Sequence, residues 1–310
     1  MRRFVTSIIV IIGVSIFIFI LLHAAYPSPA RDVLGLKASP AAINAWNKAN
    51  GYDDPIIVQY LAYMNKLLHG NLGWSYAENQ SVLALFQERV ARSAYLSGIS
   101  LVIAVLIALP LGIFQAAKRN SIGDNVATSA AFILYSMPSF FLGLILIQVF
   151  ALSFPIFNFE ASQSLSIWVV IGDWYAMTLP IFTLALITVA SFSRYMRSSS
   201  IDVLAQDYIK VARAKGLPER LVLMRHLVRN ASLPMVTLIG LSLPALLAGN
   251  LITESLFNFQ GLGLLFFESL QKVDYPVLLA YTLAGAVLVV IGNLVADIAL
   301  TVADPRIRLA

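Results

Sequence analysis

The sequence predicts an all-α integral membrane protein with six transmembrane helices and both termini on the cytoplasmic side. Three observations lead to this fold class. Of the 310 residues, 59% are hydrophobic and 12% are charged, whereas soluble domains carry roughly 25% charged residues. Six long stretches contain no Asp, Glu, Lys or Arg. The Lys and Arg residues gather in alternate loops, which is typical of membrane proteins whose positive loops stay inside.

Each charge-free stretch is long enough to cross the hydrocarbon core of a membrane as a helix, which takes about 20 residues. Strands of membrane barrels need only about 9–11 residues, so these stretches favour a helical bundle. In the third stretch, Pro155 and Asn158 predict a helix that ends early and continues as an apolar loop. The stretches cover residues 4–30, 93–117, 125–159, 174–193, 230–253 and 275–296. Five glycines within them predict points of close helix packing: Gly13, Gly112, Gly143, Gly240 and Gly285.

The N-terminal third divides into a first helix and an outer segment. Residues 1–26 form the predicted first helix, whose apolar run from Phe4 to Leu22 has 19 residues. Because a cleaved signal peptide has an apolar core of about 7–15 residues, this run favours an uncleaved span over the alternative of a signal peptide. Residues 27–92 are too polar to cross the membrane and predict an extracytoplasmic segment. Four apolar residues at helical spacing predict one amphipathic helix within it: Val58, Leu61, Met64 and Leu68.

Residues 93–310 form the predicted five-helix core, and the distribution of charge orients it. With a cytoplasmic N-terminus, the inside segments hold 14 Lys and Arg residues and the outside segments hold 7. Of those 7, all but Lys272 lie in the long outer segment, where the positive-inside rule has little weight. Arg306 and Arg308 near the C-terminus fall on the inside. Both termini are therefore predicted to be cytoplasmic.

The cytoplasmic loop over residues 194–232 is the most informative part. Residues 194–229 carry 8 basic and 3 acidic residues, a net charge of +5 that equals the charge of the whole chain. Gly216 and Pro218 predict the end of one short helix and the start of another. Two amphipathic faces favour docking to a partner or to a lipid surface, and the alternative is a solvated basic loop that only sets the topology. The apolar residues at helical spacing are Ile201, Leu204, Tyr208 and Val211, then Leu217, Leu221, Met224 and Val228.

No constellation of residues predicts catalysis or metal binding. The chain has no cysteine, and its histidines, His23, His69 and His226, stand too far apart in sequence to suggest a zinc site. It has no Gly-x-x-x-x-Gly-Lys-Ser/Thr motif and therefore no phosphate-binding loop of its own. The chain is strongly apolar and its net charge is only +5, which also argues against binding to nucleic acid. The sequence predicts a protein that is not an enzyme.

Three further residues lie at or within spans and are candidates for special roles. Glu254 lies near the outer end of the fifth span. A carboxylate there either has a functional role, in contact with a solute that passes through the spans or with a partner protein, or is a helix-end residue bonded to nearby backbone. Asp297 follows Asn293 by one helical turn, so the two share a face and predict a structural interhelical bond.

Sequence motifs along nearly the whole chain carry a family resemblance. In the inner loop, Asp207-Tyr-Ile-Lys-Val-Ala-Arg-Ala-Lys-Gly216-Leu precedes Arg225-His226-x-x-Arg229-Asn230-Ala231-x-Leu233-Pro234. This arrangement resembles the coupling loop of binding-protein-dependent ABC importer permeases, in particular the first permease subunit of dipeptide, oligopeptide and nickel importers. Further motifs resemble other parts of that family: Gly13-Val-Ser15, Pro55-Ile-Ile-Val-Gln59-Tyr60, Gly70-Asn-Leu-Gly73, Ser136-Met-Pro138-Ser-Phe140, Glu254-Ser-Leu-Phe257, Asp274-Tyr275-Pro276, Asn293-Leu-Val-Ala-Asp297 and Asp304-Pro305-Arg306.

The resemblance implies a type I ABC permease fold in the inner membrane and a transport cycle of alternating access. It implies a heterodimer with a second, homologous permease, two cytoplasmic ATPase subunits that bind ATP and Mg, an extracytoplasmic solute-binding protein, and surrounding lipid. This chain itself is expected to bind no cofactor. The implied substrate is a dipeptide or oligopeptide, with nickel or glutathione-like solutes as alternatives.

The resemblance also assigns site residues. Those implied to couple to the ATPase are Asp207, Tyr208, Ala212, Arg213, Ala214, Lys215, Gly216, Leu217, Arg225 and His226. Those implied for the translocation path or outer gate are Glu254, Phe257, Gly261 and Gly263. Those with implied structural roles are Pro234, Asn293 and Asp297.

Two rival classes make different demands on the sequence. An ion-coupled secondary transporter predicts internal repeats and ionisable residues near the middle of its spans, but the middles of all six stretches lack charge. An intramembrane enzyme needs paired reactive groups inside its spans, and the sequence offers none there.

Overall fold

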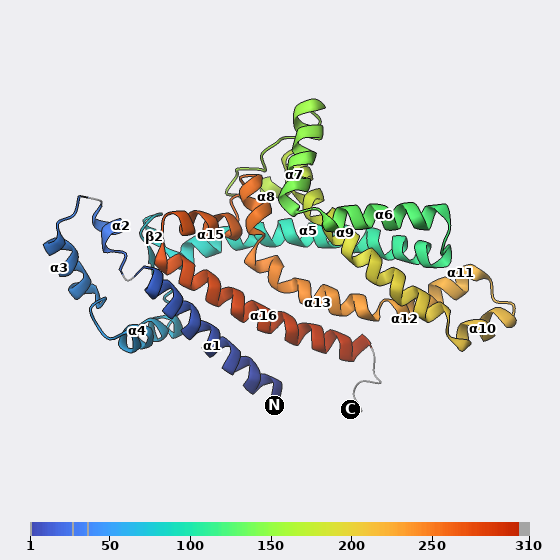
Figure 1. Ribbon diagram of the computed structural model, residues 1–310, viewed down its shortest axis with the longest axis horizontal. Coiled ribbons are helices and arrows are strands. Elements are labelled where there is room, and N and C mark those ends of the chain that lie inside the picture. The colour runs from blue at the N-terminus through green and yellow to red at the C-terminus, as the bar shows by residue number, and fades with distance from the viewer. Residues whose placement is uncertain (1, 27, 36, 304–310) are drawn as a thin grey trace.

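The computed structural model describes residues 2–26, 28–35 and 37–303, which form an elongated, mainly helical molecule (Figure 1). The two basic residues near the C-terminus, Arg306 and Arg308, lie outside the described residues. The elements are α1 (Arg2–Ala25), α2 (Ala30–Leu34), α3 (Pro40–Asn50), α4 (Ile56–Leu68), β1 (Trp74–Ser75), β2 (Gln80–Ser81), α5 (Val82–Ala117), α6 (Ile122–Ser136), α7 (Ser139–Ile147), η1 (Gln148–Ser153), α8 (Ile167–Gly172), α9 (Trp174–Leu204), α10 (Asp207–Ala214), α11 (Glu219–Leu221), η2 (Val222–Leu227), α12 (Val228–Ala231), α13 (Leu233–Ala248), α14 (Leu251–Leu256), α15 (Leu262–Gln271) and α16 (Tyr275–Ala303).

 Within the described residues, β1 and β2 form a small antiparallel hairpin directly before α5, in which Trp74 pairs with Ser81 and Ser75 with Gln80.

By length and apolar composition, the described residues contain four single helices that can cross a membrane and two bent helix pairs that can each count as one more span. The single helices are α1, α5, α9 and α16, and the bent pairs are α6 with α7 and η1, and α11 to α12 with α13. Backbone groups inside lipid must be bonded within the chain, and these helices meet that demand. The six predicted stretches correspond to these four helices and two pairs, which supports the predicted helical membrane fold.

The helical part of the third predicted stretch ends at Ser153, shortly before Pro155, which confirms the predicted helix end and apolar loop. The stretch also has a second break near its middle, which was not predicted. The axis bends by 106° between α6 and α7. Pro138 directly precedes α7 with an extended backbone, and a proline has no N–H to continue the hydrogen bonding of the preceding helix. Its ring also disfavours a helical conformation at the residue before it, here Met137, which is extended. As Figure 1 shows, α7 consequently projects away from the bundle.

The second predicted stretch is shorter than the helix that contains it. Helix α5 begins at Val82, where the Ser81 hydroxyl accepts a hydrogen bond from the amide of Ala84 at 3.2 Å. Arg92 is the charged residue directly before the second charge-free stretch. It lies inside the helix and is only 1% exposed. Its Nε donates to the carbonyl of Glu88 at 3.2 Å. A search for uncharged residues therefore finds where the apolar part begins and misses the first turns of the helix.

Small residues allow the long helices to approach closely, as predicted at three of five glycines. A Cβ at Gly112 would lie 2.9 Å from a backbone nitrogen of α9, and one at Gly240 would lie 2.7 Å from a Cα of α16. Gly143 is also crowded, by a side chain of α14. The prediction is wrong at Gly13 and Gly285, where nothing lies within 4 Å of an added Cβ.

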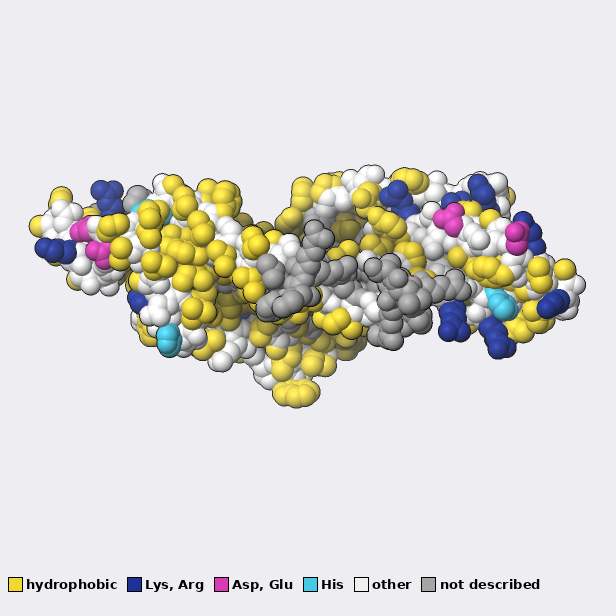
Figure 2. Space-filling view, turned by 90° about the horizontal axis from the view of Figure 1, so that it is seen from below, with side chains coloured by type: hydrophobic (Ala, Val, Ile, Leu, Met, Phe, Trp, Pro, Cys, Tyr) yellow, Lys and Arg dark blue, Asp and Glu magenta, His cyan; other side chains and the backbone are white. Residues whose placement is uncertain are grey.

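The two ends of the molecule differ in composition. Helices α2, α3 and α4 lie at one end, and α10 and α11 lie at the other (Figure 1). The predicted amphipathic helix is confirmed as α4, although Leu61 and Leu68 on it are exposed. Phe19 of α1 and Leu279 of α16 pack with tyrosines of α4 and thereby attach this end to the spans. Figure 2 shows hydrophobic side chains over the middle of the molecule and basic side chains gathered over α10 to α12.

Candidate functional site

The candidate site begins with α10, a helix of 8 residues that is separate from α9. The spacing of Ile201 and Tyr208 predicts one continuous helix there, and this is wrong. Helix α9 ends at Leu204, and Gln206 has an extended backbone that starts α10 in a new direction. Asp207 in the first turn suits the positive end of the helix dipole.

The end of α10 is fixed by a left-handed glycine. Gly216 has a φ of +77°, a conformation that residues with a Cβ rarely adopt. Its N–H donates to the carbonyl of Arg213 at 2.9 Å, and the N–H of Leu217 donates to the carbonyl of Ala212 at 3.3 Å. These two bonds form a Schellman motif. Pro218 then precedes α11, so the predicted helix stop and restart are confirmed.

A bidentate ion pair holds the turn closed from outside. Arg213 donates from Nε to one carboxylate oxygen of Glu219 at 3.0 Å and from Nη2 to the other at 2.6 Å. Within α10, Lys210 donates a single hydrogen bond from Nζ to Oδ1 of Asp207 at 2.8 Å, and this hydrogen bond lowers the pKa of Asp207 below its ordinary value. Both pairs are solvent-exposed, so each contributes little stability of its own.

Helix α10 buries one face and exposes another. Ile209 and Ala212 are buried against Val222. Tyr208 is 43% exposed and Val211 is 52% exposed. The predicted apolar face is therefore not continuous from α9 to α10, because the extended backbone at Gln206 separates the two helices.

The second predicted apolar stripe is also altered. Residues Val222–Leu227 form a π-helix, η2, which takes more residues per turn than an α-helix. Val222 and Leu227 are consequently buried, whereas Met224 is 64% exposed. Leu227 packs with Met196 of α9 and Met235 of α13, so the segment is joined to two of the long helices.

We name residues 205–232 the inner segment. Several of its basic and small residues face solvent, among them the predicted site residues Ala214, Lys215 and Arg225, while His226 is half-buried. Its exposed surface thus combines apolar side chains, Tyr208 and Met224, with surrounding positive charge (Figure 2). Such a surface suits attachment to another molecule more than chemistry on a substrate.

A second group of predicted site residues lies together near the start of α15. The Glu254 side chain is fully buried and accepts four hydrogen bonds. Its Oε1 accepts from the Ser93 hydroxyl at 2.8 Å and from the amide of Asn250 at 3.0 Å. Its Oε2 accepts from the amides of Gly263 at 2.7 Å and Leu264 at 3.2 Å. The carboxylate therefore lies at the N-terminus of α15, where free N–H groups and the helix dipole favour a negative charge.

Both glycines of this group leave room for the carboxylate and the backbone beside it. A Cβ at Gly263 would lie 2.7 Å from the backbone nitrogen of Leu251, and a Cβ at Gly261 would collide with Glu254. Phe257 is fully buried in a cluster with Leu96 and Met177. We name Glu254, Ser93 and the first turn of α15 the outer clamp, because they join α5, α14 and α15.

The predicted structural residues are distributed over α13 and α16. Pro234 is the second residue of α13, a position where the missing N–H of proline does no harm. Asn293 is exposed on α16, and the Asp297 side chain lies outside the described residues. Their predicted bond therefore stays a prediction.

Comparison with known proteins identifies the family. Residues 108–309 match the family described as binding-protein-dependent transport system inner membrane component, and residues 1–97 match the N-terminal family of the same transport systems. The chain belongs to this permease family. Its members are non-catalytic transport subunits of ABC importers, so this permease is a multi-pass inner-membrane protein that works with ATPase and substrate-binding components.

Relatives of this permease match along its whole length. The oligopeptide transport system permease protein AppB of Bacillus subtilis (strain 168) is 37% identical, over 99% of this chain and 98% of that protein. The glutathione transport system permease protein GsiC of Salmonella typhimurium is 32% identical over the same shares. A probable peptide ABC transporter permease protein, y4tP of Sinorhizobium fredii, is also 32% identical over the same shares.

Some residues of the permease that sequence reasoning missed are partners of those it found. Ser93 binds Glu254 across 161 residues of sequence, and Glu219 binds Arg213 across the Gly216 turn. Asp124 accepts two hydrogen bonds from Arg197 at 2.7 and 2.8 Å and thereby joins α6 to α9. Only Glu219 had a local signal, since it is the acidic residue directly after the predicted turn.

Proposed function

We propose that this chain is one of two permease subunits of an ATP-driven importer for short peptides, and that its inner segment attaches the ATPase. The observation that carries the proposal is the divided surface of α10. Ile209 and Ala212 hold the helix on its own chain, while Tyr208 and Val211 remain exposed beside basic side chains. An amphipathic helix that lies in a groove of its partner is a common recognition mode.

The attachments of the inner segment support a role in transmitting motion. Ile209 and Ala212 pack against the last turn of α9 through Val203 and Leu204. Leu227 packs against α9 and α13. A displacement of α10 by a closing pair of ATPases would therefore move both long helices and switch the pathway between inward-open and outward-open states.

The proposed assembly contains a second, homologous permease, two cytoplasmic ATPase subunits that bind ATP and Mg, and an extracytoplasmic solute-binding protein. The inner segment is then cytoplasmic, as are both termini. The apolar side chains of α7 support a neighbour in the membrane, either the second permease or lipid. Phe140 and Phe141 are each 48% exposed and Leu144 is 47% exposed.

The names of the relatives support peptide as the substrate class, with oligopeptide in one case and glutathione in another. Nickel is the remaining alternative. For Glu254 we propose a structural role in the outer clamp, since all four of its hydrogen bonds are made within this chain.

The test compares Val211→Asp with Val33→Asp in the complete transporter. Val211 lies on the exposed face of α10, and Val33 is an exposed valine of α2 at the opposite end of the molecule. We expect Val211→Asp to insert normally, to lose the ATPase subunits on purification in detergent, and to lose uptake of a labelled dipeptide. Val33→Asp should keep all three properties. Peptide uptake by this chain alone, without ATP, would contradict the proposal and favour a secondary transporter.

A further inference from the structure

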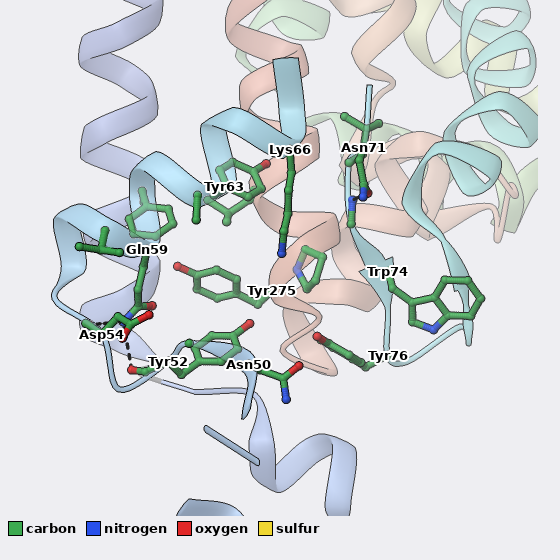
Figure 3. Close-up of a pocket in the computed structure, with 18 of the residues that line it drawn as sticks. Asn50, Tyr52, Asp54, Gln59, Tyr63, Lys66, Asn71, Trp74, Tyr76 and Tyr275 are labelled. Carbon is green, nitrogen blue, oxygen red and sulfur yellow. Dashed lines mark hydrogen bonds between the residues drawn. The ribbon is translucent and has the colours of Figure 1, made fainter. Parts of the chain in front are cut away.

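A cavity of about 440 Å³ lies in the outer end of the molecule, apart from the inner segment and the outer clamp. It is lined by the loop before α4, by α4 itself, by the strand β1 and by the start of α16, and it is partly open to solvent (Figure 3). Its volume falls in the range of sites that bind small molecules, about 300–1,000 Å³. Segments from residue 19 to residue 279 contribute to it, so the folded chain builds it from distant parts of the sequence.

Tyrosine side chains dominate the wall. Tyr52, Tyr63, Tyr76 and Tyr275 all line the cavity, and the ring of Tyr52 is stacked on Trp46 at a centroid distance of 5.4 Å. The buried hydroxyls of Tyr63 and Tyr275 have no hydrogen-bond partner among the described residues. Burial raises the pKa of Tyr63, which keeps this hydroxyl protonated and able to donate. Buried hydroxyls without partners are unfavourable, so this wall is suited to a ligand that has both apolar and polar groups.

Two opposite charges lie at different sides of the same cavity. Figure 3 shows Lys66 reaching in beside Asn71, while Asp54 lies near Gln59 and Tyr52. Neither Lys66 nor Asp54 forms an ion pair with another described residue. Asp54 lies in the turn before α4, and Lys66 lies in the last turn of that helix. The helix backbone from Ile56 to Lys66 alone rises about 15 Å at 1.5 Å per residue, so the backbones of the two charged residues are far apart.

The separation of the charges selects the ligand class. In a free amino acid the ammonium and the carboxylate share one carbon atom and cannot reach both ends of α4. In an extended peptide they move apart by about 3.3 Å for each residue. A peptide of a few residues therefore matches Asp54 at one end, Lys66 at the other and aromatic walls between.

We infer that this cavity is a binding site for a short zwitterionic peptide, with the peptide ammonium at Asp54 and the peptide carboxylate at Lys66. Apolar or aromatic side chains of the peptide pack on the tyrosines, and its backbone bonds to the hydroxyls of Tyr63 and Tyr275. The site lies on the permease itself and needs neither ATP nor the solute-binding protein. It goes beyond the importer role, which does not require an outer peptide site on this chain.

The test uses the full-length chain in lipid nanodiscs and isothermal titration calorimetry. The probe is the tetrapeptide Ala-Phe-Phe-Ala, compared with the same peptide acetylated at its N-terminus and amidated at its C-terminus. We expect saturable binding of the free peptide at one site. The blocked peptide should bind about 10-fold more weakly or worse, since a hydrogen bond to a charged group contributes about 1.5–3 kcal/mol.

Matched variants separate the site from general charge effects. Asp54→Asn and Lys66→Gln should each weaken binding of the free peptide about 10-fold. Asp53→Asn and Lys48→Gln change neighbouring exposed residues that do not line the cavity, and they should bind as the wild type does. Tyr275→Phe should weaken binding without lowering the melting temperature, because it removes a hydroxyl that has no partner within the described chain.

Three results would overturn the inference: no binding by the wild-type chain, equal binding of free and blocked peptides, or equal loss in the matched controls. Binding that occurs only when the solute-binding protein is present would also overturn it, because the cavity would then belong to that interface. Peptide uptake by the complete transporter is measured in parallel. Normal uptake without peptide binding at this cavity would reject the outer site and leave the importer function intact.

Discussion

The inner segment and the outer clamp use polar residues in opposite ways. At the outer clamp, Glu254 is fully buried and its oxygens accept four hydrogen bonds from the same chain. In the inner segment, the ion pair of Arg213 and Glu219 faces solvent, and Val211 beside it is half-exposed. The outer clamp is therefore a completed internal joint, whereas the inner segment presents a surface that another subunit can complete.

Mutations in the two regions are therefore expected to have different effects. A change in the outer clamp leaves buried polar groups without partners, which lowers the stability of the chain itself. A change on the exposed face of the inner segment leaves the fold intact and acts on assembly. Stability and assembly can be measured separately, so the comparison can be tested at both ends.

The largest effect on stability is expected from Glu254→Ala. It leaves the Ser93 hydroxyl and three backbone amides without their acceptor, at a cost of at least about 4 kcal/mol given about 1–3 kcal/mol for each group. We expect poor recovery of folded protein and a strongly lowered melting temperature in detergent. Glu254→Gln, which keeps the volume and one acceptor oxygen, should lose less.

The matched control for this change is Glu160→Ala, since Glu160 is exposed. Glu160→Ala should have the same melting temperature in detergent as the wild type. If Glu254→Ala melts normally but loses peptide uptake, the carboxylate acts in the translocation path, and the structural role of the outer clamp is wrong.

The next effect is expected from Gly216→Pro, at the end of α10. Proline fixes φ near −65°, far from the observed +77°, and it removes the N–H that donates to Arg213. We expect about 3 kcal/mol of local destabilisation, normal membrane insertion, and loss of ATP-driven uptake. Gly216→Ala should lose about 1 kcal/mol, because a Cβ is disfavoured in the left-handed region.

Gly172→Ala is the control for the glycine change, because nothing lies within 4 Å of an added Cβ and its φ is not in the left-handed region. It should transport normally. Normal ATP-driven uptake by Gly216→Pro would remove the proposed coupling role of the α10 turn.

The sequence predicted features whose cause is local. Long apolar runs give spans because lipid demands internally bonded backbone, and Gly216 with Pro218 gives a turn because of their own backbone preferences. It failed where the cause lies elsewhere in the fold. The π-helix over Val222–Leu227 shifts the buried face, and the spacing of the apolar residues there does not predict a π-helix.

The candidate site was predictable to a similar extent. The residues of the inner segment could be found, but the division of α10 into a buried and an exposed face could not, because it depends on the break at Gln206. Ala212 is an example. It was predicted as a coupling residue, and it is buried against its own chain. The partner of Glu254, Ser93, could not be predicted either, since only the packing of α5 on α15 brings them together.

The smallest effect is expected from the ion pair that spans the Gly216 turn. The Arg213 and Glu219 side chains are 45% and 54% exposed, and exposed pairs typically contribute about 0.2–1 kcal/mol. We expect Arg213→Gln, Glu219→Gln and the double variant to melt within a few degrees of the wild type, and a double-mutant cycle to give a coupling energy below about 1 kcal/mol.

The same three variants decide whether the pair serves the turn or a partner. If it only closes the turn, ATPase recovery should fall equally little in either single variant and in the double variant. If Arg213 also contacts an acidic group of the ATPase, Arg213→Gln should lose the ATPase while Glu219→Gln retains or strengthens its binding, because Arg213 is then released from its internal partner. An asymmetry of that kind, with no change in melting temperature, would place the positive charge of the inner segment in the interface and not in the fold.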